Sequence, residues 1–251
     1  MEGFIAPADR TILARHGLAS FDALWAAQLD RVDVPNLGRG GWSTVCRLDL
    51  DGRGYYLKRQ CNHRTRSLTA PFGEPTFARE FRNIRRFESL AIPALTAAFF
   101  ARRRLERMGD CAILLTHALD GWQPLAHWLP DWPAHPEPVR ARLLAACGKL
   151  AGRLHAAGML HGCFYPKHVF LRDGGDTFEA CLIDLEKVRP LLLGRYDRCR
   201  DLDQFFRRAH GLGEDDAGIM LAAYLDCAPE SAEVADWRRH LARRGRHKNA
   251  T

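Results

Sequence analysis

Long apolar runs are missing from this sequence. No segment approaches the roughly 18 to 20 consecutive apolar residues that a membrane-spanning helix needs, so we expect no transmembrane segment. The N-terminal stretch MEGFIAPADR lacks a basic region followed by an apolar core, which indicates that no signal peptide is present. Internal repeats and low-complexity segments are also missing. These absences predict a globular protein that stays in the cytoplasm.

Closely spaced cysteine pairs are missing as well. None of the eight cysteines stands in the C-x-x-C spacing typical of a structural zinc site. A disulfide framework is typical of much shorter secreted chains. Several cysteines lie in apolar segments such as DCAILLT and EACLIDL, so we expect reduced and mostly buried thiols. The eight cysteines are Cys46, Cys61, Cys111, Cys147, Cys163, Cys181, Cys199 and Cys227, and Cys163 is an exception to this expectation because it lies in a loop that carries chemistry.

Positive charge is in excess, with a net charge of +7. Basic residues gather in the segments 81–87, 101–107 and 237–249. A basic surface attracts phosphate groups on nucleic acid, anionic lipid or a phosphorylated sugar, although charge runs often form an ordinary solvated face. No nucleic-acid motif or aromatic platform accompanies the charge, so we expect no nucleic-acid partner.

The first half of the sequence is rich in strand patterns. Apolar spacing predicts a helix over residues 18–30 with Ser20 as its N-cap. A glycine-rich turn between short alternating runs predicts strand, loop, strand, turn and strand over residues 36–60. Residues 61–73 are polar and predict a loop, and helical periodicity returns over residues 76–91.

Two more strands are predicted before residue 120, and helices predominate after it. Residues 95–119 predict two strands around a turn, and the proline- and tryptophan-rich stretch 122–138 interrupts the pattern. A long helix over 139–158 is followed by a loop and two short strands within 161–188, and then by helices from 197 to 245. This order predicts an α+β chain with two lobes. The β-rich N-lobe comprises residues 1–120, and the mostly helical C-lobe comprises residues 121–251.

A glycine-rich segment lies at residues 38–45. It fits the pattern G-x-G-x-x-G-x-V, with serine in place of the third glycine. Because glycine has no side chain, its backbone N–H group can approach a phosphate closely, and the small side chain of serine largely preserves this access. Glycine-rich hairpins are common, so the motif has weight only together with the elements that follow. The predicted nucleotide-binding residues are Gly38, Gly40, Ser43 and Val45.

Three charged residues complete a predicted nucleotide and metal site. Lys58 ends the third predicted strand, and a buried lysine there needs a partner, for which Glu80 in the following helix is the candidate. Such an ion pair aims the lysine at the α- and β-phosphates of a nucleotide. Asp184 follows a short apolar strand, where a carboxylate can hold Mg²⁺. Read singly, each of the three is equally consistent with a surface or turn residue.

The order of these elements is that of the protein kinases. Between Glu80 and Asp184 lies the loop HGCFYPKHV at residues 161–169, which follows a long helix. It aligns with the kinase catalytic loop H-R-D-x-x-P-x-N, and Asp184-Leu185-Glu186 aligns with D-F-G. The sequence is therefore expected to adopt a two-lobed protein-kinase-like fold.

Within the kinases, the chain resembles the bacterial lipopolysaccharide core sugar kinases that phosphorylate heptose of the inner core. The likeness covers residues 36–210 and lies in the compact size, His168 at the usual asparagine position, Tyr165 in the loop, and an Asp-Leu pair in place of Asp-Phe-Gly. It also implies that Asp201 braces the catalytic loop. The resemblance implies ATP and Mg²⁺ as cofactors and a lipid-linked core oligosaccharide as partner. The reaction would take place at the inner face of the cytoplasmic membrane, with the protein bound peripherally.

The catalytic-loop aspartate is replaced by Cys163. Phosphoryl transfer depends mainly on positioning and charge, so the loss of a general base costs about 10² to 10⁴ in rate. A thiolate could substitute for the aspartate only if nearby cations lowered its pKa, and His161, Lys167 and His168 are candidates. The predicted catalytic residues are thus Cys163, His161, Lys167 and His168.

Two alternatives remain open. An inert Cys163 would suit a pseudokinase that acts as a nucleotide-binding scaffold in the same pathway. The first two residues of the loop, His161 and Gly162, also match the H-G-D loop of small-molecule kinases that act on aminoglycosides or choline.

Overall fold

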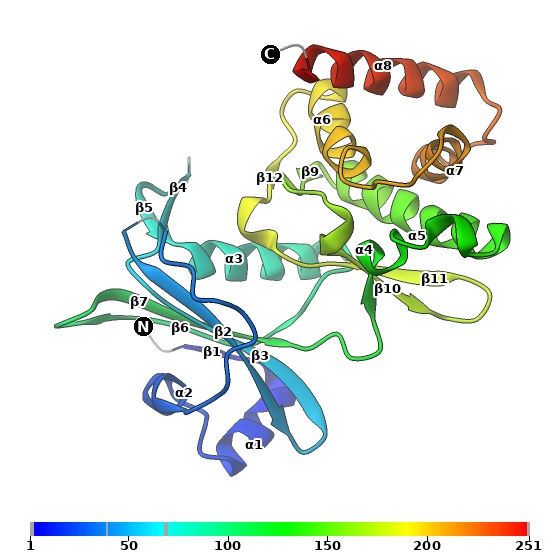
Figure 1. Cartoon of the computed structure of the whole chain (residues 1–251). Helices are drawn as coiled ribbons and strands as arrows, with labels where there is room; N and C mark the ends of the chain where they lie inside the picture. The colour runs from blue at the N-terminus through cyan, green and yellow to red at the C-terminus, as the bar shows by residue number, and fades with distance from the viewer. Residues whose placement is uncertain (1–2, 39, 68–69, 250–251) are drawn as a thin grey trace. The chain divides into compact units, whose positions relative to one another are not determined.

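The chain forms two compact units in the computed structural model, which describes residues 3–38, 40–67 and 70–249 (Figure 1). The first unit contains Met1–Ser89 and Leu95–Asp120, and the second contains Leu90–Ala94 and Gly121–Thr251. The first unit holds the large sheet, and most of the helices belong to the second. No helix in the described part of the chain is both long and apolar enough to cross a membrane.

A five-stranded antiparallel sheet is the centre of the first unit. Its strand order is β1-β6-β7-β3-β2. The β2–β3 hairpin turns at Asp51 and Gly52, whose φ angles of 48° and 76° suit the tight turn predicted from the Asp-Gly pair. The strands are β1 (Phe4–Ile5), β2 (Trp42–Leu50), β3 (Arg53–Cys61), β6 (Ala97–Leu105) and β7 (Gly109–His117).

Helices cover both faces of this sheet (Figure 1). Because side chains alternate along a strand, β3 presents Tyr55, Leu57 and Cys61 to one face and Lys58 and Gln60 to the other. The first set packs in a buried apolar cluster with residues of α1 (Pro7–Arg15) and α2 (Phe21–Ala26). The second set lies toward α3 (Thr76–Ser89), the helix predicted over residues 76–91.

Two predicted elements that precede β2 need correction. The helix predicted over residues 18–30 is only α2, although Ser20 caps it as expected, accepting a hydrogen bond from the Ala23 amide at 3.2 Å. The strand predicted before the glycine loop is reduced to isolated bridges, Arg31 to Cys46 and Asn36 to Ser43. Pro35, between these two bridges, has no backbone N–H to donate, so the segment forms no regular ladder with β2.

The loop predicted over residues 61–73 is wrong, because this segment contributes to a hairpin. Strand β4 (Arg64–Ser67) pairs with β5 (Ala70–Pro75), and most of their described side chains are exposed or half-buried. Such strands lack the alternation of apolar residues that reveals a strand with one buried face. Backbone pairing therefore forms this hairpin without a signature in the sequence.

The second unit is organised around α5 (Glu137–Ala156), the long predicted helix. It packs closely on α7 (Glu214–Leu225). At Gly148 the two helices are so close that an added Cβ atom would lie only 2.3 Å from the backbone oxygen of Met220 in α7. Gly158, with a φ of 70°, follows the helix end as predicted. The other helices are α4 (Leu125–Trp128), α6 (Arg195–Phe206) and α8 (Ala232–Asn249).

Short strands and turns carry the loops of the second unit. Strands β8 (Gln123–Pro124), β10 (Val169–Asp173) and β11 (Phe178–Leu182) form a sheet in the order β11-β10-β8, and β9 (Met159–Leu160) pairs with β12 (Arg189–Pro190). Three 3₁₀ turns, η1 (Trp132–Ala134), η2 (Pro166–His168) and η3 (Leu185–Lys187), lie between these elements. The two short strands predicted within residues 161–188 are therefore β10 and β11.

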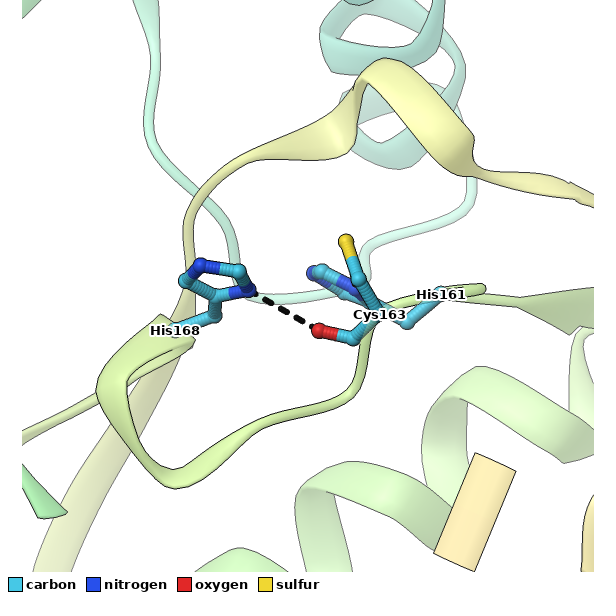
Figure 2. A group of neighbouring side chains, drawn as sticks. All are labelled: His161, Cys163 and His168. Carbon is cyan, nitrogen blue, oxygen red and sulfur yellow. Dashed lines mark hydrogen bonds between the residues drawn. The ribbon is translucent and has the colours of Figure 1, made fainter. Parts of the chain in front are cut away.

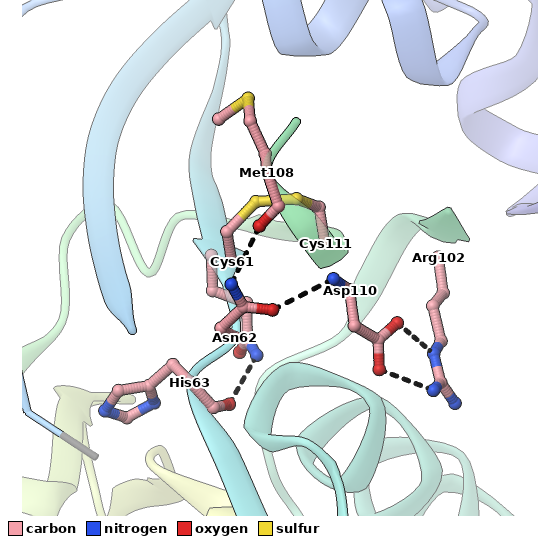
Figure 3. Close-up of a disulfide and its surroundings, with 8 residues drawn as sticks. Cys61, Asn62, His63, Arg102, Met108, Asp110 and Cys111 are labelled. Atoms are coloured by element: carbon pink, nitrogen blue, oxygen red, sulfur yellow. Dashed lines mark hydrogen bonds and ion pairs between the residues drawn. A yellow bond between two sulfur atoms is a disulfide. The ribbon is translucent and has the colours of Figure 1, made fainter. Parts of the chain in front are cut away.

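A disulfide joins Cys61 to Cys111, so the expectation of reduced thiols is wrong for these two residues (Figure 3). They lie directly opposite each other on β3 and β7, with Cα atoms 4.1 Å apart. Their separation of 50 residues hides this pairing from any spacing rule. The remaining six cysteines are free; Cys227 is half-buried and the other five are buried.

Loss of this disulfide should destabilise the protein. Closing a loop of 50 residues removes unfolded-state entropy worth up to about 4 kcal/mol. Dithiothreitol is therefore expected to lower the urea midpoint of the wild-type protein. A Cys61→Ala/Cys111→Ala double variant should unfold at the same midpoint with and without the reductant. Equal sensitivity of both proteins to the reductant would show that the disulfide makes no such contribution.

Candidate functional site

An ion pair joins the sheet of the first unit to α3. Lys58 Nζ lies 2.6 Å from Glu80 Oε1, which is the pair expected from the sequence. Both side chains are largely withdrawn from solvent, with 17% of Lys58 and 4% of Glu80 exposed. The ring centroid of Phe77, also on α3, lies 5.9 Å from the ammonium. A charge pair at this depth holds the lysine in one orientation.

The start of α3 is fixed by the end of β3. The buried Gln60 side chain accepts a hydrogen bond from the Phe77 amide at 2.8 Å and donates to the His63 carbonyl at 2.7 Å. The Thr76 amide also donates to the His63 carbonyl, at 3.1 Å. Glu80, one helical turn further on, is thereby brought to Lys58. The sequence analysis did not select Gln60. A polar residue two positions after Lys58, on the same face of a predicted strand, was the pattern that could have indicated its role.

The glycine-rich segment forms a tight turn before β2. Gly40 has a φ of 74°, and the Gly41 amide donates to the Gly38 carbonyl at 3.2 Å. Gly41 is required for a different reason, because a Cβ atom there would lie 2.2 Å from the backbone oxygen of Cys61. Arg39, within the predicted motif, lies outside the described residues. The Gly38 amide donates to Asn36 Oδ1 at 3.0 Å and the Ser43 amide donates to the Asn36 carbonyl at 2.9 Å, so these two amides already have acceptors within the chain, and the phosphate-binding role stays a prediction.

The strands place two further predicted residues beside the ion pair. Val45 on β2 lies directly across from Lys58 on β3, so their side chains share one face of the sheet. Ser43, two positions earlier, is opposite Gln60. Ser43 and Val45 thus lie on the strand that pairs with the Lys58 strand, whereas Glu80 reaches Lys58 from α3.

A buried carboxylate braces the catalytic loop of the second unit. Asp201 on α6 accepts hydrogen bonds from the backbone amides of His161 at 2.8 Å and Gly162 at 2.9 Å. Its Oδ2 also lies 3.4 Å from His155 Nε2. Burial by itself raises the pKa of Asp201, but the hydrogen bonds from His155 and the His161 amide bring that pKa below its usual value. The brace implied by the resemblance is confirmed.

Two histidines and Cys163 meet inside this loop (Figure 2). His161 shares a hydrogen bond between Nε2 and the Ile183 carbonyl at 2.9 Å, and its Nδ1 lies 3.4 Å from Cys163 Sγ. His168 Nδ1 is bonded to the Cys163 carbonyl at 2.9 Å. A carbonyl only accepts, so each bonded ring nitrogen carries a proton; in a neutral ring the other nitrogen then keeps a lone pair. Burial lowers the pKa of both histidines, which favours these neutral rings.

Cys163 is not an activated nucleophile or base. Its side chain is completely buried, and burial, followed by the charge of Asp184, raises the pKa of the thiol well above its usual value. The cation that opposes this effect is Lys187, whereas Lys167 is exposed on η2. The condition for a substitute thiolate base, a pKa lowered by Lys167, His161 and His168, is therefore not met.

Asp184 presents its carboxylate from a left-handed backbone conformation. Its φ and ψ angles are 58° and 61°, a region that non-glycine residues seldom adopt, and it stands at the N-cap position of η3, two residues after the end of β11. Its side chain is 36% exposed, while the following Leu185 is fully buried. Oδ2 of Asp184 lies 3.3 Å from His168 Nε2 and 3.7 Å from Cys163 Sγ. The predicted metal ligand thus lies beside two of the four predicted catalytic residues.

Comparison with known proteins connects this geometry to one family. Residues 22–224 match the model of the lipopolysaccharide kinase (Kdo/WaaP) family. Protein InaA of Escherichia coli K12 is 30% identical over 220 residues, which cover 86% of this chain and 91% of InaA. The lipopolysaccharide core heptose(I) kinase WaaP of Pseudomonas aeruginosa is 25% identical over 211 residues, covering 69% of this chain and 78% of WaaP.

A solved structure shares the fold. The structure titled WaaP in complex with acyl carrier protein superposes with a TM-score of 0.68 at 23% identity, covering 97% of this chain and 99% of that one. The expected protein-kinase-like fold, with a β-rich part and a mostly helical part, is confirmed by this likeness.

Removal of the Asp201 carboxylate should destabilise the second unit. In an Asp201→Ala variant two buried amide donors lose their acceptor, at a cost of about 2 to 5 kcal/mol in the free energy of unfolding. Urea denaturation measures this loss. An Asp176→Ala variant, changed in an exposed turn, serves as the control and should unfold like the wild type. Equal midpoints for the two variants would contradict the bracing role.

Proposed function

The chain belongs to the lipopolysaccharide kinase (Kdo/WaaP) family, and on that premise we propose that it is an ATP-dependent kinase that phosphorylates a heptose of the lipopolysaccharide inner core. The observation that carries the proposal is the buried ion pair of Lys58 and Glu80. An ammonium held in this way is the group that kinases direct at nucleotide phosphates.

The residues of the first unit fit the nucleotide. The glycines at Gly38 and Gly40 and the small Ser43 would let the phosphates come close to the backbone, and Val45 would supply an apolar contact on the same face as Lys58. Lys58 would bind the α- and β-phosphates while Glu80 prevents it from turning away. ATP supplies the phosphoryl group when bound.

Asp184 fits a magnesium ion. Mg²⁺ prefers oxygen ligands and is usually held by one or two carboxylates together with substrate phosphates. The half-exposed Asp184 carboxylate offers such an oxygen, whereas the neutral nitrogen of His168 is a poorer ligand for this ion. In the proposed reaction Asp184 would orient the ion, which neutralises the charge on the transferred phosphoryl group.

The acceptor side depends on positioning. The buried thiol of Cys163 stays protonated and does not remove the proton of an incoming hydroxyl group. His161 and His168 hold the loop through carbonyl hydrogen bonds, and exposed Lys167 would offer positive charge to a phosphate or an anionic acceptor. Such an enzyme works without an efficient general base, at a rate lowered by about 10² to 10⁴.

The proposed partner is the lipid-linked core oligosaccharide at the inner face of the cytoplasmic membrane, with the protein bound peripherally. Basic residues support this choice, although part of their charge is compensated locally. Arg102 and Arg103 form ion pairs with Asp110 and Asp22, and Arg82 pairs with Glu74. The attraction to an anionic glycolipid would thus come from the rest of the excess positive charge.

Two substitutions test the kinase proposal. The purified chain is incubated with ATP, Mg²⁺ and dephosphorylated core oligosaccharide, and phosphate incorporation into heptose is measured. Lys58→Met and Asp184→Ala should each reduce the rate by more than about 100-fold, because each removes a charge that stabilises the transferring group. Lys149→Met and Asp176→Ala, exposed residues of the second unit, are the matched controls and should be neutral. Activity that survives Asp184→Ala would rule out the assigned role of this residue.

A scaffold function is the second candidate, and the buried neutral Cys163 is the observation that favours it. If the chain is a slow kinase, Cys163→Asp should restore a base and raise the rate by about 10²-fold or more, whereas the similar-sized Cys163→Asn should not. Thermal unfolding of both variants verifies the fold. Stabilisation by ATP and Mg²⁺ without phosphate transfer in any of these proteins would identify a scaffold.

Transfer to an aminoglycoside or choline instead of the oligosaccharide would identify a small-molecule kinase.

A further inference from the structure

An exposed apolar loop precedes α6 in the second unit, at residues 191–196, and is called the leucine loop below. Leu192, Leu193 and Tyr196 are 69%, 64% and 55% exposed. Single apolar residues scattered over a surface need no explanation, whereas several of them together mark an interaction site. The kinase reaction proposed above gives these three side chains no role.

A buried carboxylate holds the leucine loop in this conformation. Asp197 on α6 is only 1% exposed, and its Oδ2 accepts hydrogen bonds from the amides of Leu192 at 3.1 Å and Leu193 at 3.0 Å. Arg189 donates to the other oxygen of this carboxylate at 2.7 Å. The Leu193 carbonyl accepts from the Tyr196 amide at 3.1 Å. The backbone is therefore fixed while the leucine side chains stay in solvent, so their exposure is built into the fold.

These hydrogen bonds are what entry into lipid requires. An unpaired N–H or C=O group is costly away from water, so a loop enters the edge of a bilayer only where its polar groups have partners within the protein. The Leu191 amide donates to the Gly158 carbonyl at 2.8 Å, and Asp197 holds the next two amides. Three consecutive amides thus have protein acceptors, and a loop that is already fixed loses little conformational freedom on insertion.

Positive charge surrounds the leucine loop. The side chain of Arg195 contacts Asp236 and His240 of α8, the helix that passes beside the start of α6 (Figure 1). Asp236 also pairs with Arg239, so one carboxylate faces two arginines and a histidine. Arg243 lies one helical turn after Arg239 and is exposed. The surface beside the leucines therefore carries more positive than negative charge.

Tyr196 connects the leucine loop to the end of α8. The guanidinium carbon of Arg244 lies 4.7 Å from the centroid of its ring. Tyrosine is typical of the boundary between lipid and water, because its ring is apolar and its hydroxyl group is polar. Arginine suits the same boundary, since its stem can contact apolar groups while its charge stays among the headgroups. The surface thus combines apolar, amphipathic and cationic side chains.

We propose that the leucine loop and the arginines beside it dock the protein on a lipid surface with anionic headgroups. The two leucines would enter the boundary between headgroups and acyl chains, and Arg195, Arg239 and Arg243 would bind lipid phosphates. Three side chains offer far less than the roughly 800 Å² per partner of a stable protein interface, whereas apolar insertion combined with a basic patch is sufficient for lipid. The part that this docking plays in phosphorylation rests on the proposed function.

Vesicle co-sedimentation tests this surface without nucleotide or sugar. The full-length protein should bind vesicles of equal parts phosphatidylcholine and phosphatidylglycerol, and should bind pure phosphatidylcholine at least about 10-fold more weakly. A Leu192→Ala/Leu193→Ala variant should lower the partition coefficient for the anionic vesicles by about 10-fold or more, because most of the inserted apolar surface is lost. No binding of the wild type to the anionic vesicles would overturn the proposal.

The matched control for the leucines is a Val34→Ala/Leu37→Ala variant, which removes exposed apolar side chains from the first unit. It should bind the anionic vesicles like the wild type. Equal partition coefficients for the two double variants would refute the role of the leucine loop. Thermal unfolding verifies the fold of each variant, and exposed positions are the ones whose substitution the fold tolerates best.

Charge substitutions test the basic part of the surface. An Arg239→Gln/Arg243→Gln variant should bind the anionic vesicles at least about 10-fold more weakly, since each arginine near such a surface contributes about 5-fold. An Arg104→Gln/Arg107→Gln variant loses the same net charge at exposed positions of the first unit and should bind nearly like the wild type. An equal loss in both variants would show attraction by net charge alone and would overturn the assigned surface.

Analytical ultracentrifugation separates lipid docking from self-association. The wild type without vesicles should sediment like the Leu192→Ala/Leu193→Ala variant. A wild-type dimer that dissociates when the two leucines are replaced would assign the leucine loop to a second copy of the chain and would overturn the proposal.

A kinase assay in two formats distinguishes this proposal from the proposed function. With the oligosaccharide carried on lipid in vesicles, the Leu192→Ala/Leu193→Ala variant should transfer phosphate more slowly than the wild type, and with free oligosaccharide the two rates should match. Leucine-dependent vesicle binding without any transfer would refute the proposed function alone. Transfer by a protein that binds no vesicles would refute the leucine loop alone.

Discussion

The carboxylate of Asp201 is the constraint on which the candidate site depends. It fixes the amides of His161 and Gly162, and from this point a series of hydrogen bonds extends through the loop. His161 is bonded to the Ile183 carbonyl, which immediately precedes Asp184, and His168 is bonded to the Cys163 carbonyl. Because the series is buried, each bond is costly to leave unmade, and the side chains of the loop are held in place.

The first unit uses the same principle with different residues. Buried Gln60 binds the start of α3, and the helix then delivers Glu80 to Lys58. In both units a polar side chain fixes a backbone segment, and that segment positions a charged residue. The two units differ in chemistry, because the charges of Lys58 and Glu80 suit a nucleotide, whereas the neutral thiol of Cys163 does not suit proton removal.

The sequence predicted those elements whose pattern arises from burial on one face. The β2–β3 hairpin, α3 and α5 have clear periodicity. The order of charged residues identified Lys58 and Glu80, and the family resemblance implied Asp201, before any contact was known. The β4–β5 hairpin was missed because its strands bury little, and β1 and α1 lie in a stretch for which no element was predicted. Burial of Cys163 and pairing of Cys61 with Cys111 depend on tertiary contacts, which no local spacing records.

The Cys61–Cys111 disulfide also changes the covalent topology of the first unit. It closes a ring that contains β4, β5, α3 and β6, with Glu80 inside the ring and Lys58 just outside it. A protease that cuts one peptide bond between residues 62 and 110 therefore opens the ring without separating the chain into two molecules. If the cut lies before Glu80, Lys58 and Glu80 fall on different fragments, and the disulfide still links these two fragments. A cut after Glu80 leaves both residues on one fragment, so a nicked protein keeps the ion pair in one covalent unit in either case.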